Sequence, residues 1–304
     1  MKDILGFIRS YSREVNKPIL IVCTIFIAIL IWLNYGYGLE YRMTHSSILP
    51  WPQATGHYLI YFVAFFVPHL LLLIKRKDYS NISIAFIVCF LVSPLIFAWK
   101  VSMDTTIHLS ASSDWNKYWN EVIYWPPRLM IVTAMIAVIY FFLNKEEAFY
   151  GVKPKKINWK PYCLMLLIMI PLIAAASTQH DFLAVYPKIK EILPLPANTD
   201  HGWFYKLLYE LSYGSDFITI EFFFRGFLVI GFIKWVGKDA ILPMACFYCT
   251  IHFGKPMGEC ISSYFGGLLL GIVSYHTRSI YGGLMVHLGI AWLMEAGGYI
   301  GNLH

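Results

Sequence analysis

The chain has 304 residues, of which 58% are hydrophobic and only 14% are charged, and its formal net charge is +6. Soluble domains typically carry about 25% charged residues, so this composition excludes a soluble globular protein and predicts an integral membrane protein. The basic residues lie in loops between apolar runs, so the positive charge calls for no nucleic-acid partner.

Nine apolar runs are candidate membrane spans, and each must be helical because an open sheet edge would leave backbone groups unpaired in lipid. In chain order they cover roughly residues 18–35, 57–74, 82–100, 124–143, 161–177, 207–233, 239–253, 261–276 and 279–298. The pattern predicts an all-α, polytopic transmembrane helical bundle of about eight to nine spans.

The loops indicate how the bundle lies in the membrane. If the N-terminus is cytoplasmic, most of the 24 lysines and arginines fall in inner loops, including those at 75–81 and 144–160, as the positive-inside rule requires. We therefore expect a multi-pass protein of the cell (inner or plasma) membrane. Its parts would be an N-terminal transmembrane part of about five spans (1–177), an external loop (178–206) and a C-terminal core of about four spans (207–304).

Ionisable residues occur inside three neighbouring spans of the C-terminal core. Glu221 and Arg225 lie one helical turn apart on one helix face, and His252 and His287 lie on two later spans. Such groups are costly at membrane depth and by default mark a functional site. The alternative is a buried ion pair that only fixes helix packing.

The order and spacing of these residues resemble the CPBP intramembrane protease family, which includes prenyl-protein (CAAX) endopeptidases and bacteriocin-processing and self-immunity (Abi) proteins. That family carries Glu-Glu-x-x-x-Arg, Phe-x-x-x-His and His-x-x-x-Asn on successive transmembrane helices. The matching segments here are Ile220-Glu221-Phe-Phe-Phe-Arg225, Tyr248-Cys-Thr-Ile-His252 and His287-Leu-Gly-Ile-Ala291. The resemblance covers about residues 205–300. It implies a catalytic core at 207–304 that hydrolyses peptide bonds with a water activated between a glutamate and histidines.

Two positions depart from the family pattern. Ile220 replaces the first glutamate, and Ala291 replaces the asparagine. Asp216 and Glu295 lie one turn beyond these positions, toward the predicted outer surface, and Glu259 follows His252 by seven residues. One hypothesis is that the site has shifted outward by about one turn (~6 Å) and uses some of these three carboxylates as supporting residues. The other is that they merely lie at a wet interface.

The sequence also contains candidate ligands for a metal ion. Cys246, Cys249 and His252 recur three residues apart on one helix face, and such a face could hold zinc. Cysteines in membrane helices are also ordinary packing residues, and no soft ligand lies on the other motif helices. No cofactor is therefore certain, and a divalent metal such as zinc stays an open alternative.

The expected function is that of an intramembrane metallo- or glutamate-type protease acting on a hydrophobic or lipid-linked peptide, with membrane lipids as its surroundings. Glu221, Arg225, His252 and His287 are its predicted catalytic residues. A catalytically impaired relative that binds peptides or membrane partners is the main alternative, because Ile220 and Ala291 lack the expected polar groups. A small transporter is a weaker one, since the sequence has no inverted repeat.

Overall fold

The computed structural model describes residues 2–47, 52–76, 80–110, 112–143, 145, 148–153, 157–196 and 199–303. Within these ranges all regular secondary structure is helical, which confirms the all-α class. The elements are α1 (Lys2–Glu14), α2 (Lys17–Tyr37), α3 (Leu39–Thr44), α4 (Pro52–Lys75), α5 (Ile84–Ser102), α6 (Ser113–Ile123), α7 (Pro126–Leu143), η1 (Phe149–Gly151), α8 (Lys160–Ala176), α9 (His180–Val185), η2 (Lys188–Ile192), α10 (Gly202–Glu221), η3 (Phe222–Ile230), α11 (Ile233–Val236), η4 (Gly237–Ala240), α12 (Ile241–Thr250), α13 (Met257–Thr277) and α14 (Tyr281–Gly301).

Short polar signals set the starts of two long apolar helices. The side chain of Asn16 accepts a hydrogen bond from the amide of Ile19 and so caps α2, which has a proline in its first turn. Ser83 caps α5 in the same way through the amide of Phe86. These helices therefore begin where an N-cap residue meets the apolar run.

Several helices are long and apolar enough to cross a membrane. In the part of the chain that the structure describes these are α2, α4, α5, the continuous segment Ser113–Leu143 and α13, and the pair Lys160–Ala176 and His180–Ile192, bent by 98°, adds a sixth if it counts as one span. The chain is therefore a multi-pass membrane protein with five to six candidate spans. The sequence also predicted spans at α10, α12 and α14, and for those three helices the prediction stays a prediction.

Helices α10, α12 and α14 are not long and apolar enough to count as candidate spans, for different reasons. Helix α12 has ten residues, which extend about 15 Å, half of the ~30 Å thickness of a bilayer core. All ten are buried by protein, so this helix needs no contact with lipid. Helices α10 and α14 contain several glycines and ionisable side chains, Glu210 and Glu295 among them, which lower their mean hydropathy.

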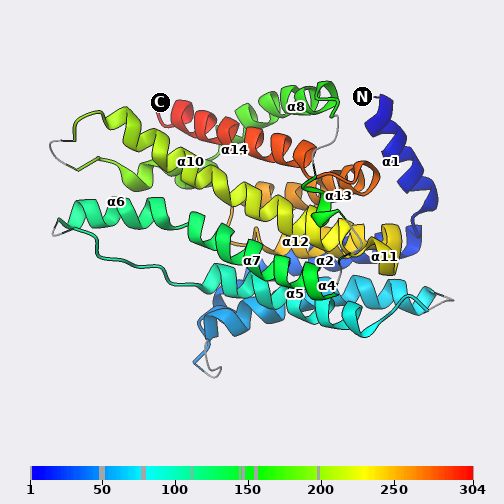
Figure 1. Ribbon diagram of the computed structural model, residues 1–304. Helices are drawn as coiled ribbons and strands as arrows, with labels where there is room; N and C mark the ends of the chain where they lie inside the picture. Colours follow the sequence, from blue (N-terminus) through cyan, green and yellow to red (C-terminus); the bar gives the residue numbers. More distant parts are fainter. Residues whose placement is uncertain are drawn as a thin grey trace.

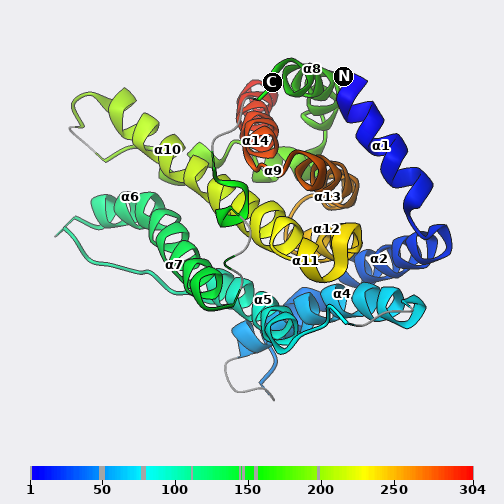
Figure 2. The same cartoon turned by 45° about the vertical axis from the view of Figure 1, so that its right-hand side comes forward.

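Helix α12 lies at the centre of the bundle and packs against α2, α4, α13 and η3 (Figures 1 and 2). Its Phe247 contacts the rings of Phe65 on α4, Phe97 on α5 and Phe224 in η3. One hydrophobic core thus contains residues from both the N-terminal and the C-terminal part of the chain. The N-terminal helices build the wall behind the C-terminal ones.

The segment that continues α10 is a π-helix, η3, and all nine of its residues are buried. Two glycines, one inside η3 and one directly after it, let Tyr150 approach this part of the chain closely. A Cβ atom at Gly226 would lie 2.8 Å from the carbonyl oxygen of Tyr150, and one at Gly231 would lie 2.7 Å from its ring. π-Helical turns recur at functional sites, and this one begins directly after Glu221.

Candidate functional site

Glu221 is the last residue of α10, and its side chain is completely buried. Its Oε1 atom lies 3.0 Å from Nδ1 of His287 on α14 and 3.3 Å from Nη1 of Arg225 in η3. A carboxylate with neither partner would be strongly unfavourable in this apolar place. The two contacts therefore fix Glu221 between three elements of the C-terminal core.

A glycine on α14 makes the room for this carboxylate. A Cβ atom at Gly283 would lie 2.4 Å from Oε2 of Glu221, far inside van der Waals distance. Oε2 itself is buried and has no hydrogen-bond partner among the described residues. The second carboxylate oxygen is thus left available to accept a hydrogen bond from a ligand or water.

Arg225 is also completely buried, and its guanidinium carbon lies 4.1 Å from the ring centroid of Tyr248 on α12. This is a cation–π contact of the kind that stabilises a desolvated arginine. Apart from the ion pair with Glu221, none of its side-chain nitrogens donates a hydrogen bond to a described residue. Their N–H groups are therefore available to donate to a ligand or water.

Tyr248 connects the two histidines. Its hydroxyl lies 3.1 Å from Nε2 of His287, and its backbone carbonyl oxygen lies 3.0 Å from Nδ1 of His252. The rings of Tyr248 and His252 are also in contact, with centroids 4.7 Å apart. Both nitrogens of His287 are thus engaged, Nδ1 by Glu221 and Nε2 by Tyr248.

The structure therefore brings the four predicted catalytic residues into one neighbourhood. Glu221 contacts both Arg225 and His287, and His252 joins them through Tyr248. The catalytic roles of these residues stay predictions.

The three predicted supporting carboxylates lie elsewhere and have other partners. Asp216 forms an ion pair of 2.6 Å with Lys100 on α5. Glu259 accepts hydrogen bonds of 3.0 and 3.2 Å from the Tyr186 hydroxyl, and Glu295 accepts 2.7 and 3.1 Å bonds from the amides of Lys188 and Ile189. None of these contacts reaches Glu221 or a site histidine. Glu259 and Glu295 instead attach the segment between α8 and α10 to α13 and α14.

The two residues that depart from the family pattern, Ile220 and Ala291, also lie in apolar surroundings. Ile220 is 8% exposed and belongs to the main hydrophobic core. Ala291 is 3% exposed and packs in a small cluster with Tyr213 and Phe217. Their side chains therefore contribute no polar group to the site.

The side chains do not gather into a metal site. In the described ranges no group of three or more His, Cys, Asp or Glu side chains could hold a metal ion. The Sγ atom of Cys249 lies 3.9 Å from Sγ of Cys260, and the nitrogens of His287 already contact Glu221 and Tyr248. The donor set predicted from Cys246, Cys249 and His252 thus does not fit zinc, and no step below uses a metal.

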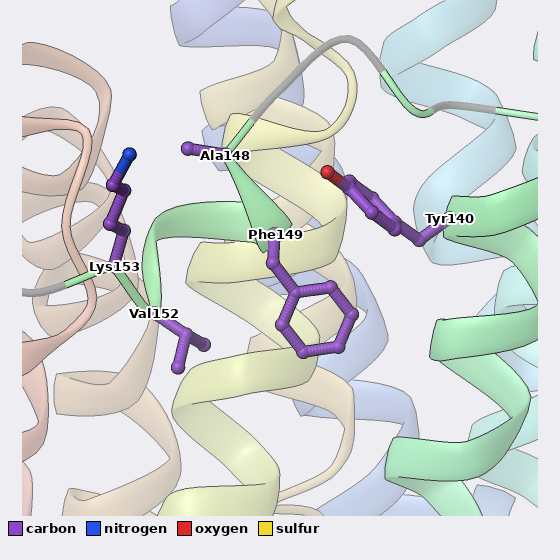
Figure 3. A pocket seen from close by; sticks show the side chains of 5 residues that line it. All are labelled: Tyr140, Ala148, Phe149, Val152 and Lys153. Atoms are coloured by element: carbon purple, nitrogen blue, oxygen red, sulfur yellow. The ribbon is translucent and has the colours of Figure 1, made fainter.

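A separate pocket lies between α7 and η1 (Figure 3). It has a volume of about 390 Å³ and is lined by Tyr140, Ala148, Phe149, Val152 and Lys153. It contains none of the predicted site residues. The candidate site is therefore the buried Glu221 cluster, and this pocket is a different feature of the surface.

The fold and this cluster define a multi-pass helical membrane protein with a buried carboxylate, arginine and histidines on neighbouring core helices. Comparison with protein families makes the class specific. Residues 203–293 match the family described as "Type II CAAX prenyl endopeptidase Rce1-like", and the chain carries a domain of that family over these residues. A search of curated proteins and a search of solved structures found no match.

Two residues of the site were missed by the sequence analysis. Tyr248 enters the sequence prediction only as the first residue of its motif, although its hydroxyl contacts His287. The hydroxyl at a position where the family has phenylalanine was the available signal. Gly283 gave no signal, because a glycine pair near a helix start is common in membrane helices.

Proposed function

We propose that this protein is an intramembrane endopeptidase that hydrolyses a peptide bond in a hydrophobic or lipid-linked peptide. The buried contact between Glu221 and His287, inside the segment that matches the family, is the observation that carries the proposal. Ionisable groups kept at such a place at a cost in free energy are typical of functional sites. The family description favours a prenylated CAAX peptide as the substrate class.

The site residues would divide the chemistry among them. Glu221 holds His287 in one orientation and stabilises positive charge on it, as the carboxylate of a catalytic triad does. His252 would position the attacking water, and His287 would be the base that finally takes up its proton; a base placed in this way accelerates hydrolysis by about 10²–10⁴-fold. The unused N–H groups of Arg225 would stabilise the negative charge that develops on the carbonyl oxygen.

The proposal includes a membrane arrangement. The chain would lie in the cell membrane with its N-terminus in the cytoplasm, and α10, α12 and α14 would complete the predicted eight to nine spans around the site. The core at 207–304 would then contain the catalytic residues. The 1–177 part would form a wall beside this core, and the 178–206 segment would cover its outer side. Membrane lipids would surround the bundle and supply the hydrophobic substrate.

Cleavage assays on site variants test the proposal. We expect His287→Ala, His252→Ala and Glu221→Gln each to lower the cleavage rate of an internally quenched prenylated peptide by about 10²-fold or more. His108→Ala is the control, because His108 is exposed in the α5–α6 connection. Full activity of both histidine variants at matched folded protein would refute the assigned site.

A second candidate function follows from Ile220 and Ala291, whose buried apolar side chains replace two polar residues of the family pattern. A protein without them could use the same site to bind a peptide without cutting it. In that case the prenylated peptide would bind to the purified protein and remain intact, and Glu221→Gln would change its affinity.

A further inference from the structure

Tyr248 contacts three residues of the candidate site. Its hydroxyl meets His287, its ring lies under the guanidinium of Arg225, and its carbonyl oxygen faces His252. A Cβ atom at Gly267 would lie 3.0 Å from its ring, so α13 leaves space for it. The related family motif has phenylalanine here, which would fill the same space without a hydroxyl.

The chemistry of Glu221 fixes the direction of the hydrogen bonds. In its ion pair with Arg225 the carboxylate is charged and can only accept, so Nδ1 of His287 must carry the hydrogen. In an imidazole that carries only this one hydrogen, Nε2 is an acceptor. The Tyr248 hydroxyl must therefore donate its hydrogen to Nε2, and its own oxygen keeps lone pairs that can accept a further hydrogen.

Resting on the function proposed above, we propose that Tyr248 is a catalytic residue that passes a proton between the attacking water and His287. The water oxygen bonds to the peptide carbonyl carbon, the C=O π electrons move onto the carbonyl oxygen, and one water hydrogen moves to the Tyr248 oxygen. The Tyr248 hydrogen moves at the same time to Nε2 of His287, which leaves an imidazolium beside Glu221. The C=O double bond then re-forms as the C–N bond breaks, and the proton returns along the same path to the departing nitrogen.

The surroundings of the ring favour this role. A guanidinium 4.1 Å from the ring centroid stabilises negative charge on the phenol oxygen as its proton leaves. Glu221 in turn stabilises the imidazolium that forms. The relay would replace the base that Ile220 cannot provide, and phenylalanine at position 248 could not take part in it.

Removal of the hydroxyl alone tests the relay. We expect Tyr248→Phe to lower kcat for an internally quenched farnesylated peptide by about 10²-fold with KM nearly unchanged, because the ring contacts stay in place. Tyr264→Phe is the matched control, since it removes a hydroxyl whose partner is Thr24 on α2. The control should retain the parent kcat.

A second measurement reports on the hydrogen bond without any turnover. In protein with isotope-labelled histidine, the nitrogen NMR signals of His287 should show a hydrogen on Nδ1 and an acceptor at Nε2. Tyr248→Phe should shift the Nε2 signal, and Tyr264→Phe should leave it unchanged. A hydrogen on Nε2 in the parent protein would overturn the relay, because Tyr248 could then not donate to it.

The outcomes separate this inference from the proposed function. Parent activity that is lost in His287→Ala but retained in Tyr248→Phe would overturn the relay and leave the protease intact. A parent protein that cleaves none of the hydrophobic or prenylated peptides offered to it would overturn both. Activity that falls in Tyr248→Phe through KM alone would make Tyr248 a binding residue and would also overturn the relay.

Discussion

At the scale of single residues, the position of Glu221 depends on the glycine that faces it on α14. Gly283 has no side chain, and the Glu221 carboxylate fills the space where a Cβ atom would be. The carboxylate can then reach His287, four residues further along α14. A small residue on one helix therefore decides whether an ion on another helix can meet its partner.

This dependence predicts the effect of one methyl group. We expect Gly283→Ala to displace the Glu221 carboxylate, because the new Cβ would lie 2.4 Å from Oε2, and to lower the cleavage rate by about 10-fold or more. Gly266→Ala is the matched control, since no atom lies within 4 Å of the Cβ position at Gly266. Equal cleavage rates for the two alanine variants, measured at matched folded protein, would contradict this account of Glu221.

At the scale of elements, the buried ion pair of Lys100 and Asp216 joins α5 to α10. The two side chains are only 7% and 17% exposed, so loss of one partner leaves a buried charge. We expect Asp216→Asn to lower the free energy of unfolding by about 3–5 kcal/mol. Lys100→Met combined with Asp216→Asn should recover part of that loss in thermal unfolding.

The same comparison separates stability from catalysis. If Asp216 only joins two helices, the folded fraction of Asp216→Asn should cleave peptide at a rate close to that of the parent. A 10²-fold lower rate in the folded variant would instead agree with the sequence prediction that Asp216 assists catalysis.

Glu295 attaches η2 to α14 through two backbone amides. An amide side chain accepts less strongly than a carboxylate, so we expect Glu295→Gln to weaken both bonds. Hydrogen exchange at Lys188 and Ile189 should then become faster, whereas Glu191→Gln, at an exposed position of the same segment, should leave it unchanged. Unaltered exchange in Glu295→Gln would show that other contacts hold the segment.

At the scale of the whole molecule, helix ends that lie far apart in the chain are gathered at the two ends of the bundle. In Figure 1 the start of α5 and the α11 region lie at the right-hand end, whereas the starts of α6 and α10 lie at the left-hand end. The α11 region and the start of α5 therefore lie toward the same end of the bundle, and the membrane orientation that the basic residues predict stays a prediction.

Cysteine labelling tests this orientation. In a variant without the exposed Cys163, we expect Glu191→Cys to react with an impermeant thiol reagent in intact cells, because Glu191 is exposed in the predicted outer segment. Lys153→Cys should react only after the membrane is permeabilised. The reverse pattern would place the N-terminus outside.

The sequence predicted the helices more fully than the contacts between them. Apolar runs and ionisable intramembrane residues are local signals, so the nine predicted spans lie on helices, and Glu221 and His287, predicted to belong to one site, are in contact. The partners of Asp216, Glu259 and Glu295 could not be predicted, because they come from segments far away in the chain. The short α12 was also missed as a wholly buried helix, since an apolar run does not reveal whether lipid or protein covers it.

Hydrolysis in heavy-oxygen water tests the central claim most directly. The purified parent protein, incubated with a farnesylated peptide that ends in a CAAX sequence, should release two fragments, and the new carboxylate should carry one oxygen from the labelled water. His287→Ala, folded to the same extent, should yield neither fragment on the same time scale. An intact peptide with the parent protein, or equal cleavage by His287→Ala, would contradict the account.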